Sequence, residues 1–99
     1  MRINFSDPNK EHNIVSLLRD AGYHPEQNRR TGEVSYVRSL GGEYPRFHIY
    51  LEELPDGWNV NLHLDQKRPS YGGSYAHSGE YDGEVVQEET ARLKQIFKT

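Results

Sequence analysis

The sequence predicts an α+β domain in which two helices cover one face of an antiparallel three- or four-stranded sheet, in α-β-β-β-(β)-α order. The segments 7–21 and 83–98 each carry a single apolar stripe at helical spacing. Between them, residues 47–67 (FHIYLEELPDGWNVNLHLDQK) alternate between apolar and polar side chains, as a half-buried hairpin does. Both stripes need an apolar partner, so we expect both helices on one face of the sheet and water on the other. With 99 residues, the chain 1–99 is expected to form a single domain.

The first predicted helix spans 7–21. Asp7 is a suitable N-cap, and Pro8 would then occupy the first helical position, where its missing N–H is not needed. Gly22 favours the end of this helix, because glycine readily adopts the left-handed conformation found there. The stripe consists of Ile14, Leu17, Leu18 and Ala21. Ahead of the helix, residues 1–5 alternate and are expected to form a short strand.

Two further strands and the second helix follow from similar signals. Residues 33–39 are rich in valine and tyrosine, and 23–28 are the expected hairpin partner, confined to a sheet edge by Pro25. The second helix is expected over 83–98, with Asp82 as its N-cap. Its apolar stripe consists of Val86, Leu93, Ile96 and Phe97.

The central hairpin has a strong turn signal. Asp56 and Gly57 fit a two-residue type I′ loop. That loop sets three opposing pairs: Leu51 with Leu62, Ile49 with Leu64, and His48 with Asp65. The predicted apolar face comprises Phe47, Ile49, Leu51, Trp58, Val60, Leu62 and Leu64. A slip of one residue would bury the polar set instead, so the pattern specifies which face is buried.

The polar face of this hairpin holds the candidate site. His48, His63 and Asp65 are expected to form one patch, because opposed and diagonal side chains on a sheet lie within reach of each other. Two imidazoles and a carboxylate are a ligand set suited to a divalent metal such as zinc or manganese, and His77 in the next loop is a further candidate ligand.

Other interpretations of the same patch remain open. A histidine–carboxylate pair across two strands is also a common structural feature of a solvated face. In a metal-free acid–base site, Asp65 would orient His48 or His63. The open face and the long loop 67–83 also contain residues typical of a ligand-binding or contact surface. The candidates for ligand binding are Tyr50, Asn61, Lys67, Tyr71 and Tyr75.

Composition narrows the classes of function. The chain has no cysteine, which excludes disulfides, thiolate nucleophiles and cysteine-based zinc sites within it. It contains no apolar run of signal-peptide or membrane-spanning length, so we expect a cytoplasmic protein without a membrane partner. The formal net charge of −3 disfavours a nucleic-acid partner, because binding to phosphates usually requires a basic surface.

Two resemblances add to these expectations. The runs NLHLDQKRPSYGG (61–73) and AHSGEYDGEVV (76–86) are similar to small uncharacterised bacterial proteins with a HLDQK-PSY…AHSGEYDG pattern. This similarity covers most of the chain from Ala21 onward, and it implies no activity and no functional residues.

A weaker similarity is to HicA-type toxins, small RNA-cleaving proteins with an α-β-β-β-α order. The segment FHIY (47–50) resembles the histidine segment of that family, although Arg46 and Phe47 stand before His48 where the family has Gly-Ser. It implies an RNA-directed nuclease with His48 or His63 as general acid–base. Besides a binding site on the open face and an RNA-directed nuclease, a third possible function is that of a structural or protein-interaction module without a site.

Overall fold

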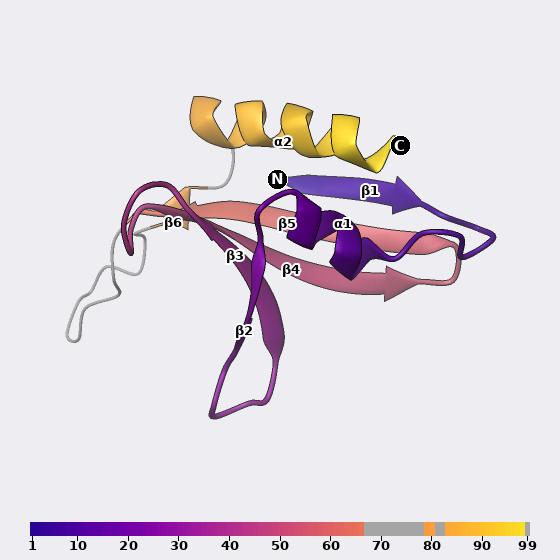
Figure 1. The fold of residues 1–99 in the computed structure, drawn as a ribbon, viewed down its shortest axis with the longest axis horizontal. Coiled ribbons are helices and arrows are strands. Elements are labelled where there is room, and N and C mark those ends of the chain that lie inside the picture. Colours follow the sequence, from indigo (N-terminus) through magenta and orange to yellow (C-terminus); the bar gives the residue numbers. More distant parts are fainter. Residues whose placement is uncertain (67–78, 81–82, 99) are drawn as a thin grey trace.

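The chain folds into a curved antiparallel sheet with two helices, as predicted for the α+β class. The computed structural model describes residues 1–66, 79–80 and 83–98. Its elements are β1 (Arg2–Ser6), α1 (Ile14–Asp20), β2 (His24–Gln27), β3 (Val34–Ser39), β4 (Arg46–Leu54), β5 (Gly57–Asp65), β6 (Gly79–Glu80) and α2 (Glu84–Phe97). The strand order is β1-β5-β4-β3-β2, and β6 also pairs with β5 (Figure 1).

The sheet is larger than the three or four strands predicted, whereas the short strand expected ahead of the first helix is present as β1. β1 pairs with β5 along Arg2–Ser6, which adds a strand to the central hairpin. β2 extends the opposite edge, where its Pro25 requires no partner on the outer side. The two-residue β6 lies within the predicted loop 67–83, and its pairing partners on β5 are Leu64 and Asp65.

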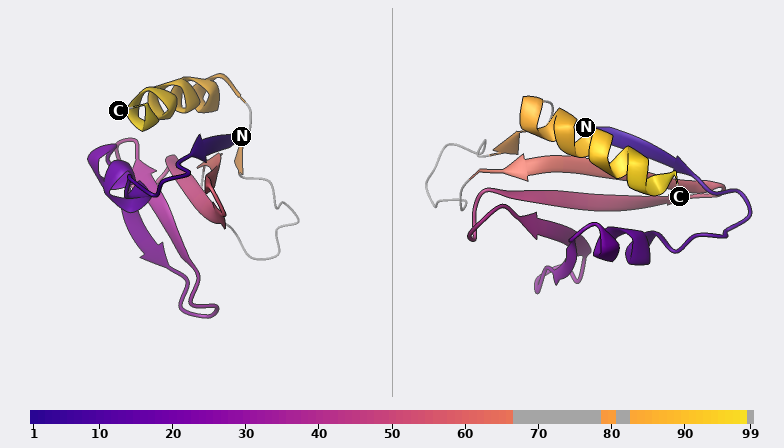
Figure 2. Two further views of the ribbon diagram at one scale, coloured as in Figure 1. Left: turned by 90° about the vertical axis from the view of Figure 1, so that its right-hand side faces the viewer. Right: turned by 45° about the horizontal axis from the view of Figure 1, so that its top comes forward.

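Both helices cover the same face of the sheet, as predicted (Figure 2). Ile14 and Leu18 of α1 belong to the same buried cluster as Val86, Leu93 and Phe97 of α2. The strands contribute Ile3, Phe5, Phe47, Ile49, Val60, Leu62 and Leu64. Leu51 and Trp58, which were predicted to be core residues, are only half-buried and pack against the edge of the cluster.

The first helix is shorter than predicted, and Asp7 is not its N-cap. α1 begins at Ile14, and the side chain of Asn13 caps it by accepting hydrogen bonds from the N–H groups of Val15 and Ser16. The stretch 8–13 contains no apolar residue, so forming a helix there would bury nothing. The left-handed backbone of Lys10 (φ 55°) also interrupts a helix at that point.

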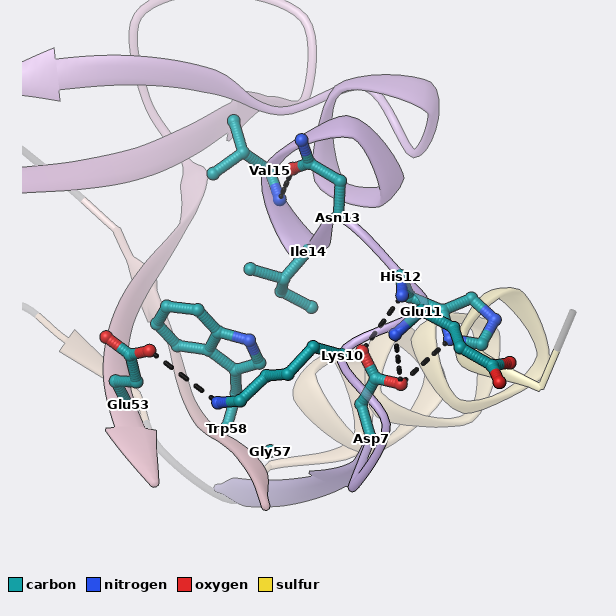
Figure 3. Close-up of a pocket in the computed structure, with 10 residues that line it drawn as sticks. All are labelled: Asp7, Lys10, Glu11, His12, Asn13, Ile14, Val15, Glu53, Gly57 and Trp58. Atoms are coloured by element: carbon teal, nitrogen blue, oxygen red, sulfur yellow. Dashed lines mark hydrogen bonds and ion pairs between the residues drawn. The ribbon is translucent and has the colours of Figure 1, made fainter. Parts of the chain in front are cut away.

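Asp7 instead holds the loop that leads into α1. Its carboxylate accepts hydrogen bonds from the backbone N–H groups of Glu11 and His12, at 3.1 and 2.9 Å, and contacts the His12 imidazole (Figure 3). A cavity of about 410 Å³ lies beside this loop and is lined partly by Trp58. The carboxylate of Asp7 thus stabilises the backbone of this loop.

The second helix also begins differently from the prediction. Its N-cap is Gly83, which makes no side-chain capping hydrogen bond, whereas Asp82 lies outside the described residues. The buried stripe agrees with the sequence, except that Ile96 is half-buried and that the polar residues Glu89 and Thr90 are buried as well.

The central hairpin has the predicted faces but a register shifted by two residues. Leu54 pairs with Gly57, so Pro55 and Asp56 form the loop, and His48 opposes His63. In the predicted register Pro55 would flank the loop, where a hairpin uses the backbone N–H that proline lacks. Gly57 instead lies against β1, where an added Cβ would approach the carbonyl oxygen of Phe5 to 2.0 Å. A shift by two residues keeps each side chain on its predicted face.

Candidate functional site

Two neighbouring strands carry the three predicted site residues on the sheet face opposite the helices. His48 lies on β4, and His63 and Asp65 lie on β5. Because His48 opposes His63, the two imidazoles stack with their centroids 5.0 Å apart. Asp65 follows His63 by two residues, which returns its side chain to the same face. The three side chains predicted from the sequence therefore lie together.

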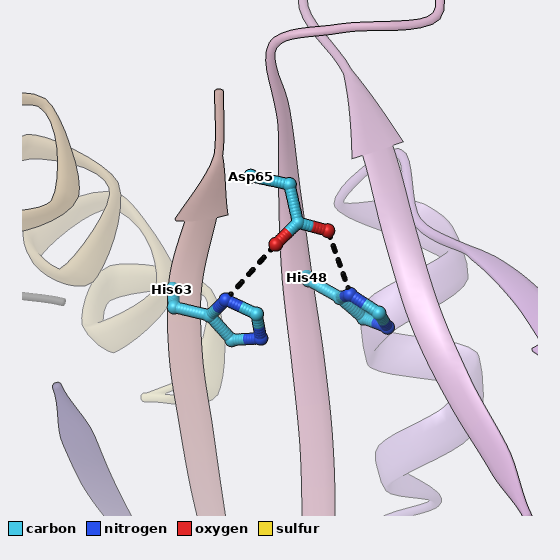
Figure 4. A group of neighbouring side chains, drawn as sticks. All are labelled: His48, His63 and Asp65. Atoms are coloured by element: carbon cyan, nitrogen blue, oxygen red, sulfur yellow. Dashed lines mark hydrogen bonds and ion pairs between the residues drawn. The ribbon is translucent and has the colours of Figure 1, made fainter. Parts of the chain in front are cut away.

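The carboxylate of Asp65 bridges the two imidazoles (Figure 4). Its Oδ2 lies 2.9 Å from Nδ1 of His48, and its Oδ1 lies 3.1 Å from Nδ1 of His63. One potential metal-ligating atom from each residue lies within 4.8 Å of the other two. Both histidines thus direct the same ring nitrogen towards one carboxylate.

The site is more enclosed than the sequence predicts. We expected an open face, yet His48 is only 8% exposed, and the side chain of His63 is 14% exposed. Tyr50, on the same face, covers these rings: its ring stacks on His48 at 4.6 Å and on His63 at 5.7 Å between centroids. A substitution of either histidine will therefore disturb packed neighbours.

Ser35 is a member of the site that the sequence analysis missed. It lies on β3, is 7% exposed, and its Oγ lies 2.7 Å from Nε2 of His48. The six residues 40–45 that join β3 to β4 carry no two-residue turn signal that would have set the register. With the observed register, Tyr36 pairs with Ile49, which brings Ser35 diagonally opposite His48. The alternation of 33–39 alone could have assigned Ser35 to this face.

Charged side chains surround the Asp65 carboxylate. Nε of Arg46 lies 3.4 Å from Asp65, and the same guanidinium makes a bidentate contact with Glu26 on β2, at 2.9 and 3.2 Å. Burial acts to raise the pKa of Asp65, but the hydrogen bonds and charges of His48 and His63 outweigh it. The net result is a pKa well below the usual range of a carboxyl group, so Asp65 is an anion at neutral pH.

Two cavities flank the site, one on each side of Tyr50. The smaller, of about 170 Å³, is lined by Ser35 and His48 and includes Glu26 and Glu33. The larger, of about 500 Å³, is lined by Met1, Arg2, Tyr50, Asn61, Leu62 and His63.

Tyr50 and Asn61, two of the predicted ligand-binding residues, therefore lie beside His63. The other predicted residues, Lys67, Tyr71, Tyr75 and His77, lie outside the described residues.

Comparison with family models, curated proteins and solved structures finds no match to this chain. Within 1–66, 79–80 and 83–98, neither helix has the length and apolar character needed to cross a membrane. The function proposed for this chain therefore rests on the chemistry of the site.

Proposed function

We propose that the protein binds a divalent transition-metal ion, zinc foremost, through His48, His63 and Asp65. The observation that carries this proposal is the convergence of two imidazole nitrogens on one carboxylate, with the ligand atoms within 4.8 Å of each other. Two histidines and one carboxylate are a recurrent zinc ligand set. Three protein ligands leave a coordination position for water or substrate, so the site is suited to binding an exogenous ligand.

The hydrogen bond at the far side of His48 supports this role. A histidine that ligates a metal usually donates its other ring N–H to a neighbouring acceptor, which sets the tautomer. Nε2 of His48 has such an acceptor in the hydroxyl of Ser35, 2.7 Å away. Ser35 in turn lies 3.5 Å from the carbonyl oxygen of Glu26, to which it donates. With the proton on Nε2, the lone pair of Nδ1 faces the other two ligands.

Local charge also favours a cation. Asp65 and Glu26 carry two negative charges against one positive charge on Arg46, a sum of −1 when both imidazoles are neutral. A divalent ion would change this sum to +1, with Glu26 held by Arg46 at the edge of the cluster. Asp65, as an anion, is ready to ligate without releasing a proton.

Zinc titration of the tag-free protein tests the proposal. Wild type is expected to unfold at a higher temperature with zinc, because binding to the native state adds about 2.7 kcal/mol at a hundredfold excess over Kd. His63→Ala is expected to weaken zinc binding by more than about a hundredfold, beyond the effect of losing an outer-shell contact. His24→Ala is the matched control, because it removes an exposed imidazole outside the cluster. Equal zinc binding by wild type and His63→Ala would refute the site.

A second candidate function is favoured by the contact between His48 and Ser35. In the other tautomer, Nδ1–H of His48 donates to Asp65 and Nε2 accepts from the Ser35 hydroxyl, which is the order of a Ser-His-Asp hydrolase. His48 would then take the Ser35 proton as Oγ attacks an ester carbonyl, and would give that proton to the departing alcohol as the ester C–O bond breaks and an acyl-enzyme forms. The two functions require opposite tautomers of one imidazole, so bound zinc should block the reactivity of Ser35.

Ser35→Ala separates these two functions by two measurements. If Ser35 orients His48 for the metal, we expect the substitution to weaken zinc binding by about 10–100-fold. If Ser35 is a nucleophile, wild type should be labelled at Ser35 by a fluorophosphonate reagent, and His48→Ala should not. Zinc binding unchanged in Ser35→Ala would rule out the positioning role, whereas absence of labelling in zinc-free wild type would rule out the hydrolase.

A further inference from the structure

We propose that the cavity of about 500 Å³ beside His63 binds a small organic anion, a carboxylate or phosphate monoester on an aromatic body, whose charged group reaches the metal. This inference rests on the proposed metal site and specifies what occupies its open coordination position. Cavities of roughly 300–1,000 Å³ are typical of small-molecule sites.

Pairing of the strands places the cavity next to the metal ligands. Arg2 of β1 opposes Asn61 of β5, and Asn61 opposes Tyr50 of β4, so the three side chains form one row on the face opposite the helices. His63 is two residues beyond Asn61 and lies in the adjacent row of the same face. Side chains in adjacent rows are within reach of a long residue or a small ligand.

Arg2, which lines this cavity, provides the anion-binding group. Its Nε donates a hydrogen bond to Oδ1 of Asn61 at 3.1 Å, which orients the guanidinium and leaves its other N–H groups as donors. Arginine binds carboxylates and phosphates through such paired donors. Among the described residues that line the cavity, Arg2 carries the permanent side-chain charge, and it is positive. A carboxylate or phosphate would bring the complementary charge to both Arg2 and the metal.

The remaining walls suit a ring. The rings of Tyr50 and His63, which both line the cavity, are parallel, with an interplanar angle of 0°. Aromatic side chains favour offset stacking with another ring. The neighbouring cavity of about 170 Å³ is lined by Glu26 and Glu33, whose carboxylates repel an anion. An anion is therefore favoured in the cavity lined by Arg2 and disfavoured in the cavity lined by Ser35.

Calorimetric titration of the zinc-loaded protein with benzoate, phenyl phosphate and benzamide tests this inference. We expect one or both anions to bind and benzamide, the neutral relative of benzoate, to bind at least about tenfold more weakly, as loss of a charge-assisted hydrogen bond implies. Arg2→Ala should raise the Kd of the anion by a similar factor. Arg19→Ala removes the same charge from an exposed position on α1 and should leave this Kd unchanged.

Removing zinc separates this inference from the proposed function. If the anion reaches the metal, its Kd rises in the zinc-free protein, and by linkage the anion tightens zinc binding by the same factor. A preference for phenyl phosphate over benzoate, or the reverse, would identify the anionic group. Zinc binding without binding of either anion would overturn the inference and leave the metal site standing. The same conclusion would follow if the anion bound with an equal Kd in the zinc-loaded and the zinc-free protein. Absence of zinc binding would overturn both.

Discussion

Replacing Glu89 with alanine is expected to lower the free energy of unfolding by about 3 kcal/mol, because the substitution removes the centre of a buried polar network. Glu89 is only 4% exposed. Its carboxylate accepts the hydroxyl of the buried Tyr23 at 2.5 Å and makes a bidentate contact with Arg92 at 2.7 and 2.8 Å. Arg38 of β3 lies 3.6 Å away. Without the carboxylate, the Tyr23 hydroxyl is left buried without this acceptor, and two guanidinium groups lose their counter-charge.

The expected loss lies at the lower end of the range for breaking a buried pair, because the Arg92 side chain is 37% exposed and can turn towards water. Urea denaturation followed by circular dichroism measures the effect. Glu88→Ala is the matched control, since it changes the same residue type at an exposed position of the same helix. Similar losses in both variants would show that the network contributes little beyond the helix itself.

Replacing Leu62 with alanine is expected to cost about 2–5 kcal/mol, because it opens a cavity at the centre of the core. Leu62 is 1% exposed, lies on β5, and pairs with the fully buried Ile49 of β4. β5 has strand neighbours on both sides: β4 along its whole length on one side, and β1 at Gly57–Asn61 and β6 at Leu64–Asp65 on the other. A side chain missing from it therefore leaves a gap that few neighbours can fill.

Leu40→Ala provides the control for this prediction. Leu40 is 40% exposed in the connection between β3 and β4, so its truncation should change stability by no more than about 0.5 kcal/mol. Both variants should be measured at equilibrium in urea and without metal, so that zinc does not contribute to stability. An unfolding free energy of Leu62→Ala within about 1 kcal/mol of wild type would contradict the assignment of this face to the core, because truncating a buried leucine normally costs more than that.

The sequence by itself determined the class of fold and the buried face of the central hairpin. The alternation from Phe47 to Leu64 has period two, and a strand with that period places its apolar side chains on one face and its polar side chains on the other. For the same reason, His48, His63 and Asp65 were assigned to a common face even though the predicted register was two residues away from the observed one. The alternation specifies a face, and it is unaffected by a shift of two residues.

Local signals at the ends of elements were less decisive, because more than one residue satisfies them. Asp7 and Asn13 are both good N-caps, and the helix begins at the second because the apolar stripe starts only at Ile14. Asp56-Gly57 is a good hairpin loop, but Pro55 cannot donate the hydrogen bond that a loop at that position needs. Burial decided between the two N-caps, and backbone hydrogen bonding decided between the two positions of the hairpin loop.

Only the tertiary structure decided what surrounds the candidate site. The contact of Ser35 with His48 depends on the register between β3 and β4, and the position of Arg2 beside Asn61 depends on β1 pairing with β5, 59 residues along the chain. The burial of Glu89 likewise depends on Tyr23 and Arg38, which come from other elements. Periodicity reports which side of its own element a residue occupies. It carries no information on which distant element packs there, because that choice is made by the joint packing of the whole core.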